Sequence, residues 1–247
     1  MKGRKAWTRL ALVVTVVLCL TLVLCAFAPG AMAKRNVNPK VIPSHAMPYG
    51  MSYADWSAKW WQWVLAIPAV DSPFLDDSGA NAAVGQSGPV YFLCGTMEYD
   101  WDGVARAERS VTVPHGKAIF LPIINGEMSM PEAWDDMTWD DIVAFCSGYI
   151  DLVTVKTLTV DGRTIWIGDS YRVATTPVEA DAPTYTMPEG GVYPIMAGTY
   201  PFFSDGYWVM LAPLRAGAHT LALHGKAEGD GWTFETEVTY DITVVGH

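Results

Sequence analysis

Stretches in which hydrophobic and polar residues alternate fill most of the chain after residue 88. The most regular is residues 232–245, where Phe234, Val238 and Tyr240 share one parity and acidic residues or threonines stand between them. Successive side chains of a strand point to opposite faces, so this pattern predicts a strand with one buried face. The same reasoning predicts strands at residues 89–96, 109–114, 117–124, 152–160, 163–168, 171–174, 207–213, 219–226 and 232–245.

Turn residues separate these runs at short intervals. Asp161-Gly162 joins two of them as in a type I′ hairpin, where glycine accepts a positive φ angle without steric cost. Many short strands with such turns are typical of an antiparallel β-sandwich or a jelly-roll-like domain. The sequence therefore predicts a mainly β fold of this class that also carries two or more helices.

Two segments have helical periodicity instead. Residues 53–67 follow Ser52, which has the position of an N-cap with Asp55 three residues later, and most of their tryptophans fall on one side. A second helix is predicted for residues 139–151, with Thr138 as its cap and two aspartates in the first turn, where the helix dipole favours negative charge.

The first 33 residues have the pattern of an export signal. A basic start leads into the apolar run 10–28, which is followed by Pro29-Gly30 and by small residues on both sides of Met32. This predicts a signal peptide at residues 1–33 that is cleaved after Ala33. An uncleaved membrane anchor at residues 10–28 and a lipid on Cys25 stay open as alternatives. Each of them leaves the folded part outside the cytoplasm, so the predicted location is secreted or periplasmic, with the membrane reached only through the N-terminal segment.

The composition of the remaining 214 residues restricts the kind of protein and the partners that can be expected. The 247-residue chain has 51% hydrophobic residues and a net charge of -10, which is typical of a protein with a folded core. Because residues 1–33 hold four basic residues and no acid, the rest has 12 basic against 26 acidic residues, a net charge of -14. Such a charge argues against a nucleic-acid partner, which requires a basic face. We expect an extended, proline-containing arm at residues 34–51 and a single β-rich globular domain at residues 52–247.

Two cysteines, Cys94 and Cys146, remain after the predicted cleavage. An even number of cysteines in an oxidising compartment favours a disulfide between them. Two separately buried thiols are the alternative, because pairing does not follow from sequence.

Three blocks carry a resemblance to known sequences: SAKWWQW, GANAAVGQSGPVYFLCGT and VPHGKAIFLPIINGE. In these blocks the chain resembles an uncharacterised group of bacterial exported proteins. The resemblance implies export and a single domain, and it implies no activity, ligand or catalytic residue.

The end of the third block is the best candidate for a functional site. A fully apolar run leads into Asn125 and Glu127, and loops at strand ends often carry function. If neighbouring aromatic residues exclude water from Glu127, its pKa rises toward the range useful for acid or base chemistry, which makes Glu127 the best single candidate for a catalytic residue. Asn125-Gly126 is also a strong hairpin signal, so a plain turn is the competing interpretation.

Tryptophans outside the buried helix stripe are candidates for a ligand-binding surface. Trp61 lies off that stripe, and Trp101 and Trp134 stand beside acidic residues in loop-like segments. Exposed aromatic residues of this kind are typical of interaction surfaces.

A calcium loop is a weaker possibility at residues 98–109. Glu98, Asp100 and Asp102 match the first, third and fifth positions of such a loop, and a glycine follows at the sixth. The twelfth position, which should hold a bidentate glutamate, is Arg109. An acidic turn between two strands is the competing interpretation.

These observations favour an exported, non-catalytic binding or envelope-associated protein that needs no cofactor. Its partner is predicted to be a small molecule, a glycan or an envelope component. The alternatives are a secreted hydrolase that cleaves a carbohydrate-like polymer through Glu127 and a second carboxylate, and a surface protein stabilised by Ca²⁺.

Overall fold

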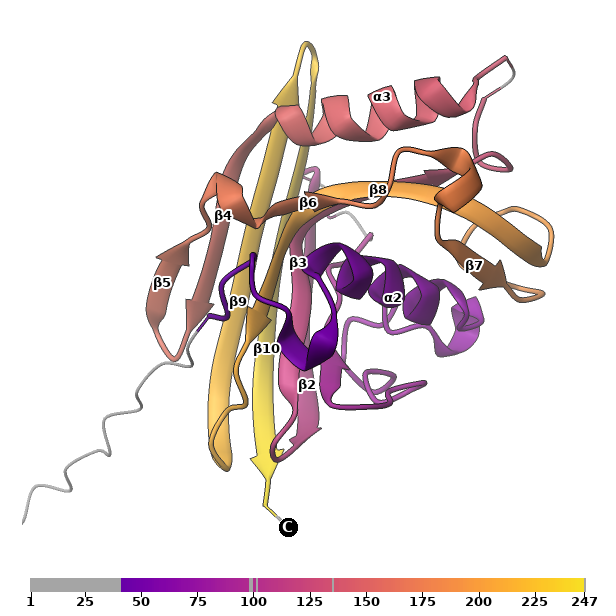
Figure 1. The fold of residues 1–247 in the computed structure, drawn as a ribbon. Helices are drawn as coiled ribbons and strands as arrows, with labels where there is room; N and C mark the ends of the chain where they lie inside the picture. Colours follow the sequence, from indigo (N-terminus) through magenta and orange to yellow (C-terminus); the bar gives the residue numbers. More distant parts are fainter. Residues whose placement is uncertain (1–40, 98–99, 101, 135, 247) are drawn as a thin grey trace, which may run out of the picture. The chain divides into compact units, whose positions relative to one another are not determined.

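The computed structural model describes residues 41–246 apart from 98, 99, 101 and 135, and this part of the chain is mainly β (Figure 1). The strands are β1 (Val90–Phe92), β2 (Val104–Pro114), β3 (Ala118–Ser129), β4 (Val153–Val160), β5 (Arg163–Trp166), β6 (Arg172–Ala174), β7 (Thr184–Met187), β8 (Gly198–Leu211), β9 (Gly217–Gly229) and β10 (Trp232–Val245). The helices are α2 (Tyr53–Leu65) and α3 (Trp139–Asp151), with short 3₁₀ helices η1 (Pro48–Gly50), η2 (Ala69–Asp71), η3 (Asp169–Tyr171) and η4 (Glu179–Asp181).

The strands form two sheets. The first has the order β1-β3-β8-β6, with β7 also paired to β8, and the second has the order β2-β10-β9-β4-β5. Each sheet contains one parallel pair, β1 with β3 and β2 with β10. The prediction of a mainly β fold with helices is confirmed, but the expectation of purely antiparallel sheets is wrong. The chain crosses to the other sheet between β1 and β3, and a crossover of this kind lets two strands of one sheet run in the same direction.

Both sheets contribute to one hydrophobic core. Leu121 of β3 and Val209 of β8 pack in the same buried cluster as Leu223 of β9 and Tyr240 of β10. In β10 the buried and exposed residues alternate from Thr236 onward, as the sequence predicts. The two sheets therefore cover each other's apolar faces.

The two helices pack on the first sheet. Helix α2 packs near β6, β7 and β8, and α3 packs against β3 and β8 (Figure 1). Both helices begin with a capping box, formed by Ser52 with Asp55 and by Thr138 with Asp141. The predicted starts of both helices are confirmed, and α2 ends at Leu65, two residues before the predicted end.

The turn at Asp161-Gly162 is also as predicted. Both residues have positive φ angles, 49° and 76°, which a type I′ turn requires. Sequence patterning missed residues 104–108 of β2, the whole of β7 and the first part of β8. β7 alternates polar and apolar residues but is only four residues long, whereas residues 198–206 of β8 lack a clear alternation.

A β-bulge interrupts β3 near its centre. Pro122 pairs with Trp208 and Ile124 pairs with Tyr207, so Ile123 is an extra residue with no partner on β8. An extra residue changes which face the following side chains occupy. Ile123 and Ile124 both enter the core between the sheets.

Glycines make room for the bulge and for the strand that follows it. A Cβ atom on Gly225 of β9 would lie 2.5 Å from the carbonyl oxygen of Ile123, and one on Gly206 of β8 would lie 2.6 Å from Cβ of Asn125. Both distances are shorter than any ordinary contact. The close approach of β9 to the bulge therefore depends on the absence of a side chain.

The two cysteines of the described chain are free, so the predicted disulfide is not formed. Cys94 lies in the aromatic core beneath α2, whereas Cys146 of α3 packs with Met128 and Phe203 in a separate cluster. Burial raises the pKa of both thiols, to about 12 for Cys94. The alternative interpretation, two separately buried thiols, describes the structure.

The predicted signal peptide and the first part of the predicted arm lie outside the described residues. Within residues 41–246, no helix has the length and hydrophobicity needed to cross a membrane. From Val41 onward the arm follows β8, with a bridge from Val41 to Leu211 and a hydrogen bond from the Ile42 N–H to the Met210 carbonyl.

Candidate functional site

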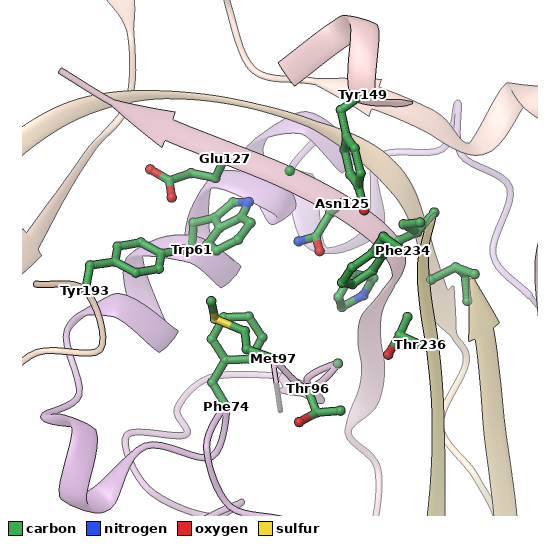
Figure 2. Close-up of a pocket in the computed structure, with 15 residues that line it drawn as sticks. Trp61, Phe74, Thr96, Met97, Asn125, Glu127, Tyr149, Tyr193, Phe234 and Thr236 are labelled. Atoms are coloured by element: carbon green, nitrogen blue, oxygen red, sulfur yellow. The ribbon is translucent and has the colours of Figure 1, made fainter. Parts of the chain in front are cut away.

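A pocket of about 210 Å³ opens beside β3, just past the bulge. Its walls come from α2, α3, β3, β10 and three loops (Figure 2). The lining residues are Trp61, Phe74, Gly95, Thr96, Met97, Pro122, Ile123, Ile124, Asn125, Gly126, Glu127, Tyr149, Tyr193, Phe234 and Thr236.

The bulge decides which side chains of β3 reach this pocket. Before the bulge, even-numbered residues such as Phe120 face α2, whereas Ile119 and Leu121 face the second sheet. After the extra residue the parity is reversed, so Glu127 pairs with Ser204 on the α2 side. Figure 2 shows Asn125 and Glu127 leaving β3 toward the space that the aromatic side chains surround.

Glu127 is the central polar group of the pocket. Both of its carboxylate oxygens are buried, and neither has a hydrogen-bond partner among the described residues. Burial raises the pKa of Glu127 well above its usual range, and the nearby carboxylate of Glu132 raises it further. The hydroxyl of Tyr193 lies close enough to oppose this shift, although its position does not satisfy the geometry of a hydrogen bond.

Two further polar groups of the pocket are buried without a partner. These are the side-chain nitrogen of Asn125 and the hydroxyl oxygen of Thr236 on β10. Nearly all buried polar groups in proteins form hydrogen bonds, and each exception requires an explanation. Three such exceptions, on Asn125, Glu127 and Thr236, lie at one cavity.

Aromatic side chains form most of the remaining wall. Trp61 is fixed by its indole N–H, which donates to the Ser204 hydroxyl at 2.7 Å, and its ring meets that of Phe74 edge-on with centroids 6.4 Å apart. On the opposite side Tyr149 contacts Phe234, also edge-on, at 6.1 Å. Gly126 leaves space for this tyrosine, because a Cβ atom there would lie 3.2 Å from the ring. The walls are therefore rigid aromatic surfaces.

Glu132 supports the site from behind. One of its oxygens accepts hydrogen bonds from the backbone N–H and the hydroxyl of Ser129, at 2.8 and 2.6 Å, and from the Tyr185 hydroxyl at 3.3 Å. Burial raises the pKa of Glu132, and its hydrogen bonds oppose that shift. Glu132 does not line the pocket, but it raises the pKa of Glu127 both through its charge and through direct contact between the two carboxyl groups.

Three of the sequence-predicted site residues meet in the pocket: Trp61, Asn125 and Glu127. The Asn125-Gly126 pair is not a turn, because β3 continues through it to Ser129 and pairs with β8. Trp61 is buried and not part of an exposed platform. Trp134 lies elsewhere, 63% exposed, with its ring against Phe145. Trp101 lies outside the described residues.

The acidic segment proposed as a calcium loop is held by an arginine. Arg106 forms ion pairs with Asp100 and Asp102, each at 2.9 Å, and a third with Glu237 at 3.1 Å. This guanidinium supplies the positive charge that a calcium ion would otherwise provide. Glu98 lies outside the described residues.

A second acidic cluster is formed by His224, Glu235 and Glu237, whose ligand atoms lie within 4.8 Å of one another. It is partly exposed, and its charges are also matched by nearby cations, since Lys226 lies 3.8 Å from Glu235 and Arg106 is paired with Glu237. This cluster is a network of ion pairs on the surface of the second sheet.

Sequence reasoning missed several residues of the pocket, among them Phe74, Met97, Tyr149, Tyr193 and Thr236. One of them left a signal. Thr236 is the polar exception on the buried parity of β10, between Phe234 and Val238. The loop residues left none, because their places depend on the folded chain.

Comparisons with known proteins found no match, neither among protein-family models nor among curated proteins or solved structures. The resemblance to bacterial exported proteins stays a prediction.

Proposed function

We propose that this chain is an exported binding protein, built as a two-sheet sandwich, that takes a small organic molecule into the pocket beside β3. One observation carries the proposal. The buried polar atoms of Asn125, Glu127 and Thr236 lack partners, and all three residues line the same aromatic cavity. An apolar pocket with a few convergent polar groups is the usual form of a small-molecule site.

The energetic cost of this arrangement supports a binding role. A buried polar group without a hydrogen bond costs about 1–3 kcal/mol, so three such groups lower the free energy of unfolding substantially in a marginally stable domain. A ligand that satisfies these atoms would recover part of that free energy on binding. The arrangement therefore favours a ligand-binding role over a stabilising one.

The size of the pocket favours a compact molecule. Its volume of about 210 Å³ is below the range of roughly 300–1,000 Å³ that holds drug-sized ligands. A polymer chain would need an open groove of greater length. Among the predicted partners, a small molecule therefore fits better than a glycan or an envelope polymer.

A hydrolase that acts through two carboxylates is the weaker candidate. Glycoside hydrolysis requires two carboxyl groups that flank the bond to be cleaved. Glu127 faces the pocket, but the nearest acid, Glu132, is engaged by Ser129 and Tyr185 and does not line the cavity. Binding requires only the groups that the pocket presents.

Export is proposed from the N-terminal pattern of the sequence. The basic start, the apolar run 10–28 and the small residues before residue 34 favour a secreted or periplasmic location. A binding protein in that place would meet ligands from the surroundings of the cell or from its envelope.

A ligand screen tests the proposal. The purified protein would be heated with members of a small-molecule library, because a ligand that binds only the folded state raises the melting temperature. Hits would be repeated on Gly95→Leu, where a side chain enters open space at the pocket, and on Gly168→Leu, an exposed glycine away from it with equally free surroundings. We expect the shift to disappear in Gly95→Leu alone. Equal shifts in both variants, or no hit, would contradict the proposal.

A further inference from the structure

We propose that the ligand is a compact organic ammonium ion, whose positive charge lies against the Glu127 carboxylate and whose alkyl groups contact the surrounding aromatic rings. This inference rests on the proposed binding function and names the class of ligand. It has three supports: the charge of the pocket, its aromatic walls, and the presence of a single carboxylate among the described lining residues.

The charge of the pocket selects against anions. Among the described lining residues the only carboxylate is that of Glu127, and none is lysine, arginine or histidine. The chain outside residues 1–33 is itself strongly acidic. An anion would enter this pocket without a counter-charge, whereas a cation would supply the partner that the buried carboxylate lacks.

The walls suit an organic cation. Trp61, Phe74 and Tyr193 surround the space near Glu127, and Tyr149 and Phe234 close its other end (Figure 2). Cations are attracted to aromatic faces, and cages of such rings are the usual sites for quaternary ammonium groups. The attraction is greater in a site from which water is excluded.

A metal ion would find only one carboxylate in the pocket. Calcium and magnesium sites draw on carboxylates for the negative charge that balances the ion. Among the described lining side chains, oxygen atoms come from Glu127, Asn125, Thr236, Thr96 and two tyrosines, and only Glu127 is a carboxylate. An alkylammonium ion needs only one counter-charge and apolar contact, which this pocket provides.

Binding of a cation would be coupled to a proton. Four titratable groups are close enough to Glu127 for one to shift the pKa of the other. They are Glu132 after β3, Tyr193 in the loop before β8, Tyr185 on β7 and Cys146 on α3. All four are acids, and none supplies a positive charge. Because burial favours the protonated form of Glu127, a cation must displace that proton, and binding must strengthen as the pH rises.

The test compares choline with 3,3-dimethylbutan-1-ol, its uncharged carbon analogue, by titration calorimetry on the purified protein. We expect choline to bind at least about tenfold more tightly, because only the cation gains the charge and ring interactions. The dissociation constant for choline should fall by up to about tenfold per pH unit below the folded-state pKa of Glu127, as release of one proton requires.

Matched variants locate the interaction. Glu127→Gln keeps the shape of the side chain and removes its charge. It should weaken choline binding by about tenfold or more and abolish the pH dependence of the dissociation constant. Glu108→Gln removes the same charge from an exposed site on β2 and should change neither. Phe74→Leu keeps an apolar contact but removes the ring, and should weaken choline more than the alcohol. Circular dichroism would check that each variant is folded.

The outcomes separate this inference from the proposed function. Equal binding of the two compounds, or choline binding that Glu127→Gln leaves unchanged, would overturn the ammonium assignment. The ammonium assignment would also be overturned if choline did not bind and the library screen found a neutral or anionic ligand instead. The proposed binding function would stand in that case. Failure of every compound would overturn both.

Discussion

Substitution of Glu127 by glutamine should change how the stability of the protein depends on pH. In the folded chain both carboxylate oxygens are buried without a hydrogen bond, and burial raises the pKa of this group well above its ordinary value of 4.5. The unfolded chain exposes the carboxyl to water, where it titrates normally. Folding above pH 4.5 therefore requires uptake of a proton in the native protein and not in Glu127→Gln.

The sign and the size of the effect follow from this difference. Below the unfolded-state pKa the carboxyl is protonated in both states and stability does not depend on its titration. Between that pH and the folded-state pKa, the folded state binds one proton more than the unfolded state. The free energy of unfolding then falls by about 1.4 kcal/mol for each pH unit. Because Glu127 and Glu132 act on each other, the difference between the two proteins reports the loss of one carboxyl from a coupled pair.

Urea unfolding at a series of pH values from about 4.5 upward would measure the difference. We expect the free energy of unfolding of the native protein to fall relative to that of Glu127→Gln as the pH rises, by about 1.4 kcal/mol per pH unit. Glu108→Gln, an exposed substitution of the same kind, should run parallel to the native protein. A constant difference between native protein and Glu127→Gln across this range would refute the view that the carboxyl is kept protonated by burial.

Three further outcomes are expected. Gly225→Ala should lower the free energy of unfolding in urea by about 1–3 kcal/mol, because its Cβ would lie 2.5 Å from a backbone carbonyl of β3. Gly168→Ala has free space around its Cβ and should leave the free energy of unfolding unchanged. Equal effects of the two substitutions would show that the sheets are not in close contact. Thr138→Ala should cost about 1 kcal/mol by removing the capping box of α3, and an unchanged urea midpoint would contradict that role. Cys94 and Cys146 should both be alkylated in denaturant without reductant, as read by peptide mass spectrometry, and protection of either would show a disulfide.

Much of the fold was predictable where a local pattern carries the information. The capping residues before α2 and α3 and the alternation in β10 are properties of adjacent residues, and each predicted an element with the correct start. The pairing of strands was not predictable in the same way. The parallel pairs β1–β3 and β2–β10 depend on crossings between sheets, which no short stretch of sequence records.

The site was predictable in part. Asn125 and Glu127 stood out because polar residues follow an apolar run, but the Asn-Gly pair favoured a turn where the structure has a continuous strand. Pro122 was the signal to use, since proline inside a strand marks an edge or a bulge. The aromatic partners Tyr149 and Tyr193 come from distant segments, so only the folded chain brings them to Glu127.

The bulge at Ile123 has an evolutionary consequence. Pairing of β3 with β8 continues on both sides of it, and every residue after it has its own partner on β8. Loss of the Ile123 codon alone would therefore leave Asn125 and Glu127 opposite Gly206 and Ser204, on the face that they occupy now. Loss of one codon between Ile124 and Glu127 would instead turn Glu127 to the other face, so we expect a lineage to tolerate deletions at the bulge and to lose the site by deletions just after it.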